Sequence, residues 1–416
     1  MKAEIINIGN ELLAGQVVNS NAQWIAEQLQ LLNIPVYQIT TISDTPQHII
    51  NALELSLKTS DLIIITGGLG PTSDDITKKV IANYFDSKLV FSQDVYNHIE
   101  LLLKTKGINK INDFNKEQAL IPENSKIFKN KYGTAPGLLF EKNNKKIICL
   151  PGVPFEMKQI FSEQIIDYLT KNFKLNPIEY KIVMIQGIFE SELSDKLKDW
   201  ETDCKKNNIS VAYLPQPGLI RLKLSALGNS NVELQEKIQK EIDKLFEIIP
   251  DNIYGFDEEM PYENIGKILK DRKKTIVTAE SCTGGKIASL ITSVPGSSEY
   301  YNGSIIAYSN KVKQEILNIP ADIIEKHGAV SKEVVELMAI NVRKLLNADY
   351  SIATSGIAGP GGGTVDKPVG TTWIAVCAEN NCISKKYLMG NLRLINIQKT
   401  SFEAFALLRK LILQDS

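Results

Sequence analysis

Short, unbroken runs of apolar residues are the feature of this sequence that most limits the folds open to it. Leu62-Ile-Ile-Ile-Thr66 is one such run. Two others that are also short and mostly apolar are Ile5-Ile-Asn-Ile8 and Lys146-Ile-Ile-Cys-Leu150. A run this short predicts a strand that is covered on both faces, as strands in parallel sheets are. Helical patterns separate the runs, so residues 1–172 are expected to form an open three-layer α/β domain. Its site should lie at the carboxyl ends of the strands.

The remaining sequence divides into two parts. Residues 173–255 combine strand patterns with amphipathic helices, which predicts a small α+β module. Residues 256–416 return to alternating strands and helices, which predicts a second α/β domain. A chain of 416 residues is too long for one ordinary core, so a division into several domains is expected.

Composition excludes some classes of function. A formal net charge of −1 gives no general attraction to nucleic acid or to a membrane surface, and no apolar run has membrane-spanning length. The sequence contains three histidines, so catalysis by histidine is not expected. The cysteines are scattered without a CxxC pair, so free thiols in a reducing cytoplasm are expected. They are Cys149, Cys204, Cys282, Cys377 and Cys382.

A glycine-rich segment with two acidic residues follows the predicted strand Leu62–Thr66. In Gly67-Gly-Leu-Gly-Pro-Thr-Ser-Asp-Asp75 the glycines let the backbone approach a ligand closely. Thr72 and the helix start behind it suit phosphate oxygens, and Asp74 and Asp75 suit a divalent cation. The same acids would also stabilise the first turn of a helix with no ligand present. The glycines concerned are Gly67, Gly68 and Gly70.

The segment from Thr278 to Lys313 concentrates reactive groups. A predicted strand, Thr275–Ala279, leads through a polar turn into a helical pattern. Lys311 and Lys313 are candidate bases, and burial beside the strands would lower a lysine pKa from its reference value of about 10.4. Lys313 is preferred, because Lys311 falls in the first turn of the helix beginning at Ser309 and should be exposed. The candidate nucleophiles are Ser281, Cys282, Thr283, Ser297 and Ser298.

Each candidate nucleophile also has an ordinary structural role open to it. Ser281 suits a helix N-cap, and Ser297, after Pro295-Gly296, suits a tight turn. Cys282 suits a small buried residue, because no neighbouring histidine would activate its thiol. The turn Ser281–Thr283 could also present N–H groups to an oxyanion or another anion at the helix start. Two glycines, Gly284 and Gly285, complete that turn, and together with Thr283 they are expected to bind the substrate.

Several motifs of the first domain together resemble the molybdopterin-binding-type domain of the CinA family. They are Gly67–Asp75, Gly9-Asn-Glu-Leu-Leu-Ala-Gly15 with Asn19 and Asn21, and Pro151-Gly-Val-Pro-x-Glu156. The resemblance implies a nucleotide pyrophosphatase that cleaves ADP-ribose with a divalent metal, Mg²⁺, Mn²⁺ or Co²⁺. The fold alone would equally suit pterin binding.

The resemblance also implies roles for residues at this first site. Asp75 and Glu156 would be metal-holding or water-positioning groups, and Asp74 would support them. The phosphate-holding residues would be Gly67, Gly68, Gly70 and Thr72.

The C-terminal motifs resemble the C-terminal domain of the same family, in family order, and the middle module corresponds to its KH-like domain. The resemblance implies nicotinamide mononucleotide deamidase activity, in which water replaces ammonia on the carboxamide and no cofactor takes part. The motifs are Thr278-Ala-Glu-Ser-Cys-Thr-Gly-Gly285, Pro295-Gly-Ser-Ser298, Tyr308-Ser-Asn-x-x-Lys313, His327-Gly-Ala-Val-Ser331, Ser355-Gly-Ile-Ala-Gly-Pro360 and Lys367-Pro-Val-Gly370.

On this resemblance we expect Ser297 to attack the carboxamide carbon and Lys313 to take its proton. Ser281 is the alternative nucleophile, and the turn Ser281–Thr283 should stabilise the oxyanion. Tyr308 joins the catalytic set through its motif, although by itself it suits a core or wall position.

The ribose phosphate is expected at the loop Gly356–Gly363, through Gly356 and Gly359, together with Arg393. The family usually has further arginine near this point, whereas Gly390-Asn-Leu-Arg-Leu-Ile-Asn396 offers Arg393 alone. This departure weakens the expected phosphate site.

The expected partners are small-molecule nucleotides, and the expected assembly is a homodimer. A competence- or damage-linked binding protein without catalysis, or a pterin- or nucleotide-binding module, is the alternative class of function. The first of these would need an exposed partner surface, such as a basic stripe on the middle module. That module also lacks the GXXG clamp with which KH domains hold RNA, so nucleic acid is not an expected partner.

Overall fold

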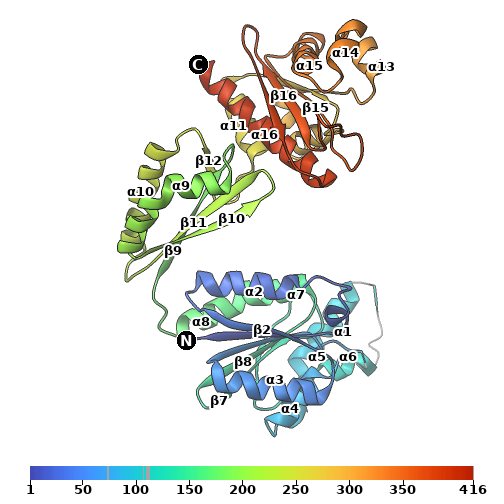
Figure 1. Ribbon diagram of the computed structural model, residues 1–416. Coiled ribbons are helices and arrows are strands. Elements are labelled where there is room, and N and C mark those ends of the chain that lie inside the picture. The colour runs from blue at the N-terminus through green and yellow to red at the C-terminus, as the bar shows by residue number, and fades with distance from the viewer. Residues whose placement is uncertain (73–74, 106, 109–112, 416) are drawn as a thin grey trace. The chain divides into compact units, whose positions relative to one another are not determined.

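The computed structural model describes residues 1–72, 75–105, 107–108 and 113–415 of the chain. These residues form two compact units, drawn in Figure 1. The first unit holds Met1–Ile178 with Gly228–Ser230, and the second holds Glu179–Leu227 with Asn231–Ser416.

A six-stranded mixed sheet forms the centre of the first unit. Its first four strands are parallel, and each of the last two is antiparallel to its preceding neighbour. Successive residues of a strand point to opposite faces, so Ile63 and Ile64 enter two different cores. This explains the unbroken apolar run at Leu62–Thr66. The strand order is β2 (Val36–Ile42), β1 (Ala3–Ile8), β3 (Leu62–Thr66), β8 (Lys145–Leu150), β7 (Gly137–Lys142) and β6 (Lys126–Phe128).

Helices cover both faces of this sheet, which confirms the predicted three-layer α/β domain (Figure 1). One face carries α2 (Ser20–Leu31), α7 (Pro154–Ile160) and α8 (Ile166–Asn172), with a π-helical turn at Phe161–Ile165 between the last two. The other face carries α3 (Pro46–Thr59), α4 (Thr77–Tyr84) and α5 (Gln93–Thr105). Four short elements complete the unit: α1 (Asn10–Leu13), α6 (Asp113–Gln118) and the paired strands β4 (Leu89–Phe91) and β5 (Leu120–Pro122).

The α+β module of the second unit is a four-stranded sheet with two helices on one face. Its strand order is β10 (Ile209–Gln216), β11 (Leu219–Leu227), β9 (Ile178–Ile185) and β12 (Ile253–Phe256). The helices α9 (Glu190–Lys206) and α10 (Asn231–Ile248) pack on it around Trp200 and Ile242. Met184 and Leu219 instead join the core of the following domain, so the module and that domain share buried hydrophobic surface.

The C-terminal domain is built on a five-stranded sheet in which β13 lies between two parallel neighbours. The last two strands run antiparallel to their neighbours, so this sheet is also mixed. The order is β14 (Tyr301–Ile306), β13 (Ile276–Glu280), β15 (Tyr350–Gly356), β16 (Thr371–Cys377) and β17 (Cys382–Leu388).

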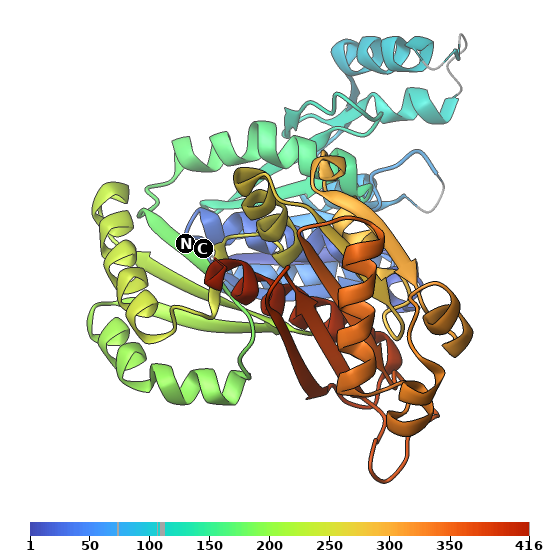
Figure 2. The same ribbon diagram turned by 90° about the horizontal axis from the view of Figure 1, so that it is seen from above.

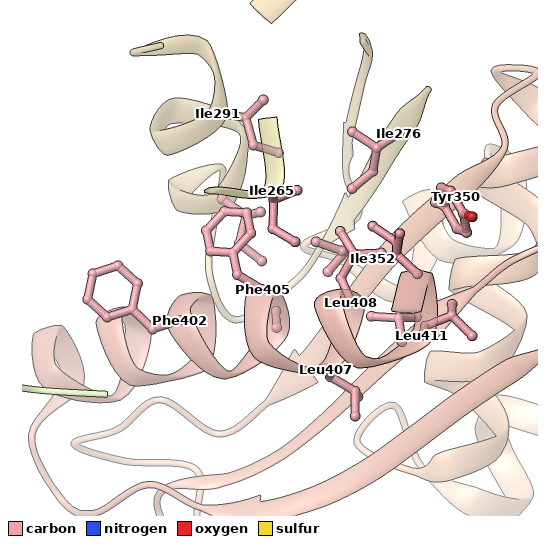
Figure 3. Close-up of a cluster of buried hydrophobic side chains, with 14 of the residues drawn as sticks. Ile265, Ile276, Ile291, Tyr350, Ile352, Phe402, Phe405, Leu407, Leu408 and Leu411 are labelled. Atoms are coloured by element: carbon pink, nitrogen blue, oxygen red, sulfur yellow. The ribbon is translucent and has the colours of Figure 1, made fainter. Parts of the chain in front are cut away.

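The helices of this domain also form two layers (Figure 1 and Figure 2). On one face α16 (Arg393–Gln414) packs with α11 (Pro261–Arg272) and α12 (Lys286–Thr292). Figure 3 shows how Phe405 and Leu408 of α16 reach Ile265 and Ile352 in this core. The other face is covered by α14 (Ala321–His327) and α15 (Lys332–Leu345), while α13 (Asn310–Glu315) follows β14.

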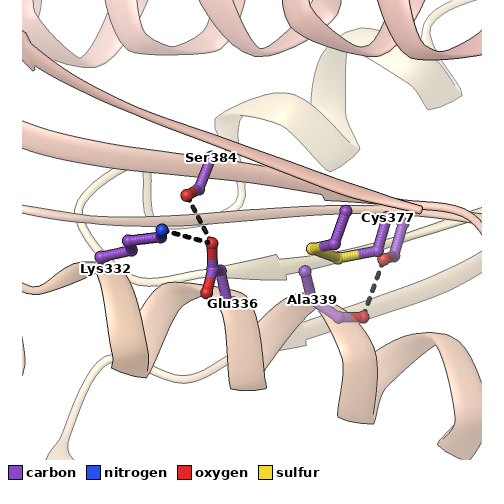
Figure 4. Close-up of a disulfide and its surroundings, with 7 residues drawn as sticks. Lys332, Glu336, Ala339, Cys377 and Ser384 are labelled. Atoms are coloured by element: carbon purple, nitrogen blue, oxygen red, sulfur yellow. Dashed lines mark hydrogen bonds and ion pairs between the residues drawn. A yellow bond between two sulfur atoms is a disulfide. The ribbon is translucent and has the colours of Figure 1, made fainter.

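The expectation of five free cysteines is wrong for two of them. Cys377 and Cys382 lie directly opposite each other on β16 and β17, with 4.1 Å between their Cα atoms, and form a disulfide (Figure 4). The other three cysteines are free and buried. Because strand register sets this pairing, the absence of a CxxC pattern did not exclude it. Unpaired thiols therefore no longer support the expected cytoplasmic location.

The helices among the described residues are all too short or too polar to cross a membrane.

Candidate active sites

The carboxyl ends of three parallel strands meet at one edge of the C-terminal sheet. Ser281 follows β13, and Glu280 at the end of that strand pairs in register with Ile306 of β14 and Thr354 of β15. β14 and β15 lie on opposite sides of β13, so this edge is the switch point at which open α/β sheets bind ligands. The topology thus places Ser281 where a reactive group is expected.

Lys313 is held beside Ser281 by a capped helix. The Ser309 side chain accepts a hydrogen bond of 3.3 Å from the Val312 N–H and begins α13. The Lys313 side chain, in the last turn of that helix, is 1% exposed. Its Nζ lies 3.2 Å from Ser281 Oγ, 2.7 Å from the Ala307 carbonyl oxygen and 3.4 Å from the Tyr308 carbonyl oxygen.

Burial lowers the pKa of Lys313 below its ordinary value of 10.5, against a smaller raising effect from Cys282. A neutral amine has two N–H donors and one lone pair. The two carbonyl oxygens of Ala307 and Tyr308 can take both donors, which leaves the lone pair for the Ser281 hydroxyl. The geometry therefore suits an amine that accepts a proton from Ser281.

Cys282 has the small, buried position that the sequence also allows for it. Its side chain is buried, and burial raises the pKa of its thiol to about 12. A thiol with this pKa stays protonated at neutral pH and is a poor nucleophile.

The carboxylate of Glu280 corrects the expectation that the α12 start holds a substrate anion. This fully buried side chain accepts hydrogen bonds from the backbone N–H groups of Gly285 (3.0 Å), Ile287 (3.1 Å) and Ala288 (2.8 Å). The positive end of α12 is therefore already matched by an internal negative charge. The Gly285 N–H, expected to bind substrate, is not free.

The Thr283 side chain is also occupied, because its hydroxyl lies 2.8 Å from the hydroxyl of Thr354 and is buried. Its backbone N–H is different: in the described part of the chain no acceptor lies within hydrogen-bond reach of it. Gly284 turns with φ +60° and has open space around it. Among the described residues, the turn Ser281–Gly284 thus leaves a backbone donor, that of Thr283, two positions after Ser281 in the chain.

Ser297 does not lie beside Lys313, so the predicted pair of these two residues is wrong. Ser297 belongs to a short 3-10 turn, Ser297–Glu299, that precedes β14, whereas Lys313 follows β14. The strand between them has six residues, which span about 20 Å. The N–H of Ser297 closes a turn onto the Val294 carbonyl oxygen, 3.1 Å away, which fits its alternative role as a turn residue.

Tyr308, Gly359 and Arg393 come together at the same edge of the sheet. Arg393 donates to the Gly359 carbonyl oxygen (2.8 Å) and to the Tyr308 hydroxyl (3.0 Å). Tyr308 is 60% exposed, so the core position that the residue alone suggests is wrong. Arg393 is also exposed, which leaves part of its guanidinium open to a ligand.

Gly356 and Gly359 have packing reasons to be glycine. A Cβ atom on Gly356 would lie 2.9 Å from the Thr371 carbonyl oxygen, and one on Gly359 would lie 2.6 Å from the Val369 side chain. Gly359 also has φ +91°, a conformation that other residues rarely adopt. Gly356 therefore lets the end of β15 lie close to the start of β16, and Gly359 lets the loop after β15 lie close to Val369.

The first unit has a pocket of about 420 Å³ at the switch point of its sheet, called the glycine pocket here. Gly67 has φ +103°, and a Cβ atom there would strike the Ile8 carbonyl oxygen, so β1 and β3 approach closely only with glycine. The pocket is lined by Ile8, Gly9, Glu11, Asp44, Gly67, Gly68, Gly70, Pro71, Asp75, Thr134, Ala135, Pro151, Gly152, Val153 and Glu156.

Asp75 and Glu156, the predicted metal-holding residues, both line the glycine pocket. Asp75 Oδ2 accepts hydrogen bonds from the backbone N–H (3.0 Å) and the hydroxyl (2.5 Å) of Thr72. Glu156, in the first turn of α7, accepts one of 2.7 Å from Asn130 Nδ2. Asp74 lies outside the described residues.

Two further carboxylates of the pocket were not predicted. Glu11 stands in the quoted motif Gly9–Gly15 but received no role, and Asp44 follows β2. Because β2 is parallel to β1, its carboxyl end meets the same edge of the sheet, and this rule could have found Asp44.

The donor chemistry of the pocket fits a hard cation. In the ranges that the structure covers, no three His, Cys, Asp or Glu side chains come together as a complete metal site. Mg²⁺ usually binds through one or two carboxylates and completes its shell with substrate phosphates and water. Asp75 and Glu156 match that partial set.

Three family models match the chain, one after another. Residues 4–171 match the probable molybdopterin binding domain, residues 180–255 the damage-inducible protein CinA KH domain, and residues 258–412 the CinA C-terminal domain. A CinA-like protein of Cytophaga hutchinsonii is 43% identical over 98% of this chain and 97% of its own length. One of Flavobacterium psychrophilum is 41% identical over 100% and 99%.

Among solved structures, CinA of Thermoplasma acidophilum is 34% identical and covers 40% of this chain and 96% of its own, with a TM-score of 0.37. The full-length relatives and the order of the three matched domains decide the family. The chain belongs to the CinA family.

Proposed function

We propose that the C-terminal domain hydrolyses the carboxamide of nicotinamide mononucleotide to nicotinic acid mononucleotide and ammonia. The observation that carries the proposal is the buried contact of 3.2 Å between Lys313 Nζ and Ser281 Oγ. A serine with a desolvated lysine as its base is a nucleophile suited to acyl transfer. The choice of substrate rests on the family resemblance.

The first half of the reaction forms an ester on Ser281. Its Oγ bonds to the carboxamide carbon while its proton passes to Lys313 Nζ. The negative charge that develops on the carboxamide oxygen would be stabilised by the backbone N–H of Thr283. The C–N bond then breaks, and Lys313 returns the proton to the leaving nitrogen, which departs as ammonia.

The second half of the reaction releases the acid. A water molecule attacks the ester carbon while Lys313 again accepts a proton. The bond from Ser281 Oγ to the acyl carbon breaks, and the serine regains its proton from Lys313. The product carries a carboxylate where the substrate carried its amide.

Arg393 is proposed to bind the ribose phosphate of the substrate. Its guanidinium is fixed by the Gly359 carbonyl oxygen and the Tyr308 hydroxyl, which orients its remaining N–H groups. Tyr308 then acts as a positioning residue for Arg393.

Product analysis tests this function. The full-length protein is incubated with nicotinamide mononucleotide, and nicotinic acid mononucleotide is separated by chromatography while ammonia is measured independently. Formation of both products in equal amounts supports the proposal. A wild-type protein that releases neither would overturn it.

We further propose that the first unit cleaves ADP-ribose to AMP and ribose 5-phosphate. The supporting observation is the glycine pocket, which gathers glycines and four carboxylates, Asp75 and Glu156 among them, at one switch point. Asp75 and Glu156 would hold a divalent cation, Mg²⁺, Mn²⁺ or Co²⁺, that offsets the charge of the phosphoryl oxygens when bound. Gly67, Gly68 and Gly70 would let the backbone approach these oxygens.

The second activity is tested by incubating ADP-ribose with the protein and each of the three cations. AMP is expected from the wild type and is expected to be lost in Asp75→Asn. Asp167→Asn is the control, because that residue forms an exposed pair with Lys171 on α8. No AMP with any of the cations would refute the activity.

A further inference from the structure

A second pocket lies beside the glycine pocket in the first unit. Its volume is about 340 Å³, at the lower end of the range for small-ligand sites. The start of α5, strand β6 and the segment that follows β6 form its walls. It is called the Val95 pocket here, and it is lined by Ser92, Asp94, Val95, His98, Ile127, Lys129, Asn130, Gly133, Thr134 and Pro136.

The two pockets share a wall. Thr134 lines both of them, Gly133 lines the Val95 pocket, and Ala135 lines the glycine pocket. A ligand that reaches over Thr134 would therefore occupy both pockets at once.

Asn130 holds this wall and ties it to Glu156. Its buried side chain donates to the Ala135 carbonyl oxygen (2.8 Å) and to the Glu156 carboxylate (2.7 Å). Its Oδ1 accepts from the N–H groups of Tyr132 (3.1 Å) and Gly133 (2.9 Å). All four hydrogen bonds of the amide are used, so Asn130 is a positioning residue and not a ligand donor.

The two pockets differ in chemistry. The glycine pocket offers carboxylates and backbone groups, which suit a metal-bound diphosphate. The walls of the Val95 pocket include Val95, Ile127 and Pro136, which suit a flat apolar surface. His98 also lines this pocket, but its Nε2 is buried and does not face the open volume. A flat ring would fit between these apolar walls.

We infer that the Val95 pocket is the nucleobase subsite of the first unit. The base of the substrate lies between Val95, Ile127 and Pro136. The diphosphate passes Thr134 into the glycine pocket. The inference rests on the proposed pyrophosphatase function, because that function supplies a ligand with a base at one end and phosphates in the middle.

The two products of the proposed cleavage provide the test, because only AMP carries a base. AMP and ribose 5-phosphate are titrated calorimetrically into the full-length protein with Mg²⁺. Saturating nicotinic acid mononucleotide is present to occupy the proposed site of the C-terminal domain, so that binding there does not contribute heat to the titration. AMP is expected to bind at least tenfold more tightly than ribose 5-phosphate.

Variants then locate the difference. Ile127, 38% exposed on β6, becomes tryptophan, which fills the pocket from its open side. Ile127→Trp is expected to reduce the affinity for AMP to that for ribose 5-phosphate. Ile39→Trp is the matched control, because Ile39 is 47% exposed on the other edge strand and lines neither pocket.

Equal affinities of the wild type for AMP and ribose 5-phosphate would overturn the subsite, as would unchanged AMP binding in Ile127→Trp. Turnover of ADP-ribose is measured separately. A wild type that binds AMP with the expected variant pattern but cleaves no ADP-ribose would support the subsite and reject the pyrophosphatase.

Discussion

Replacing Ser281 and Ser297 separately by alanine distinguishes the two candidate nucleophiles. Lys313 Nζ lies 3.2 Å from Ser281 Oγ, whereas the six-residue strand β14, about 20 Å long, separates Lys313 from Ser297. Proton transfer needs hydrogen-bond reach, so Lys313 can serve Ser281 alone. Ser281→Ala is expected to lower kcat for nicotinamide mononucleotide by at least about 10³-fold, as loss of a catalytic nucleophile does. Ser297→Ala should retain kcat within about twofold, because a partly exposed turn hydroxyl is lost.

The assay is the initial rate of ammonia release at saturating substrate, with each variant checked for folding by circular dichroism. Mass spectrometry of the wild type quenched during turnover should find an acyl adduct on the peptide that contains Ser281. Near wild-type activity in Ser281→Ala, or loss of activity confined to Ser297→Ala, would refute the reasoning.

The pH dependence gives a second check on Lys313. Only the neutral amine accepts a proton, so kcat/KM should rise with pH and level off once Lys313 is deprotonated. Burial lowers the pKa of Lys313 below 10.5, and the midpoint of the rise should therefore fall below that value. A kcat/KM that decreases across this range would contradict the role of Lys313 as base.

Three further predictions follow from buried groups. Glu280→Gln should lower the free energy of unfolding by about 2–4 kcal/mol in urea titrations, because an amide cannot accept all three N–H groups at the start of α12. The control is Glu299→Gln at an exposed ion pair, which should change the free energy of unfolding by less than about 1 kcal/mol. Burial lowers the pKa of Lys78 from 10.5 to about 8. Between about pH 8 and pH 10.5 the lysine is therefore protonated in the unfolded state and neutral in the folded state, so the free energy of unfolding should rise with pH across this range. Lys78→Met should remove the rise and add up to about 3 kcal/mol at pH 7, measured by thermal and urea unfolding. Cys282→Ala should keep deamidation within about threefold in the ammonia assay, because its buried thiol stays protonated.

The pattern of apolar runs was enough to predict both α/β domains. Ile63 and Ile64 enter cores on opposite faces of one sheet, and an unbroken run is the direct consequence of such double coverage. The helix that carries Lys313 was also predictable, because Ser309 is a strong N-cap and does cap it. Interactions between residues close in the sequence, namely side-chain alternation along a strand and helix capping, determine the buried strands and the start of this helix.

Contacts that depend on register or on distant segments could not be predicted in the same way. The disulfide between Cys377 and Cys382 exists because β16 and β17 pair those two positions. The role of Asn130 depends on Glu156, which is 26 residues away in the chain. Neither pairing has a local signature, so only the folded sheet reveals them.

The predicted pairing of Ser297 with Lys313 belongs to neither group, because the strand directions alone argue against it. Parallel strands bring their carboxyl ends to one edge of a sheet, and the segments that precede them lie at the opposite edge. Ser297 precedes β14, whereas Ser281 and Lys313 follow β13 and β14. Ser297 was preferred on the serine–lysine pattern of the family resemblance, yet once both strands are taken as parallel, its turn lies at the edge away from Lys313. In a parallel sheet, whether a serine precedes or follows its strand is therefore a stronger criterion for a nucleophile than the exposure of its hydroxyl.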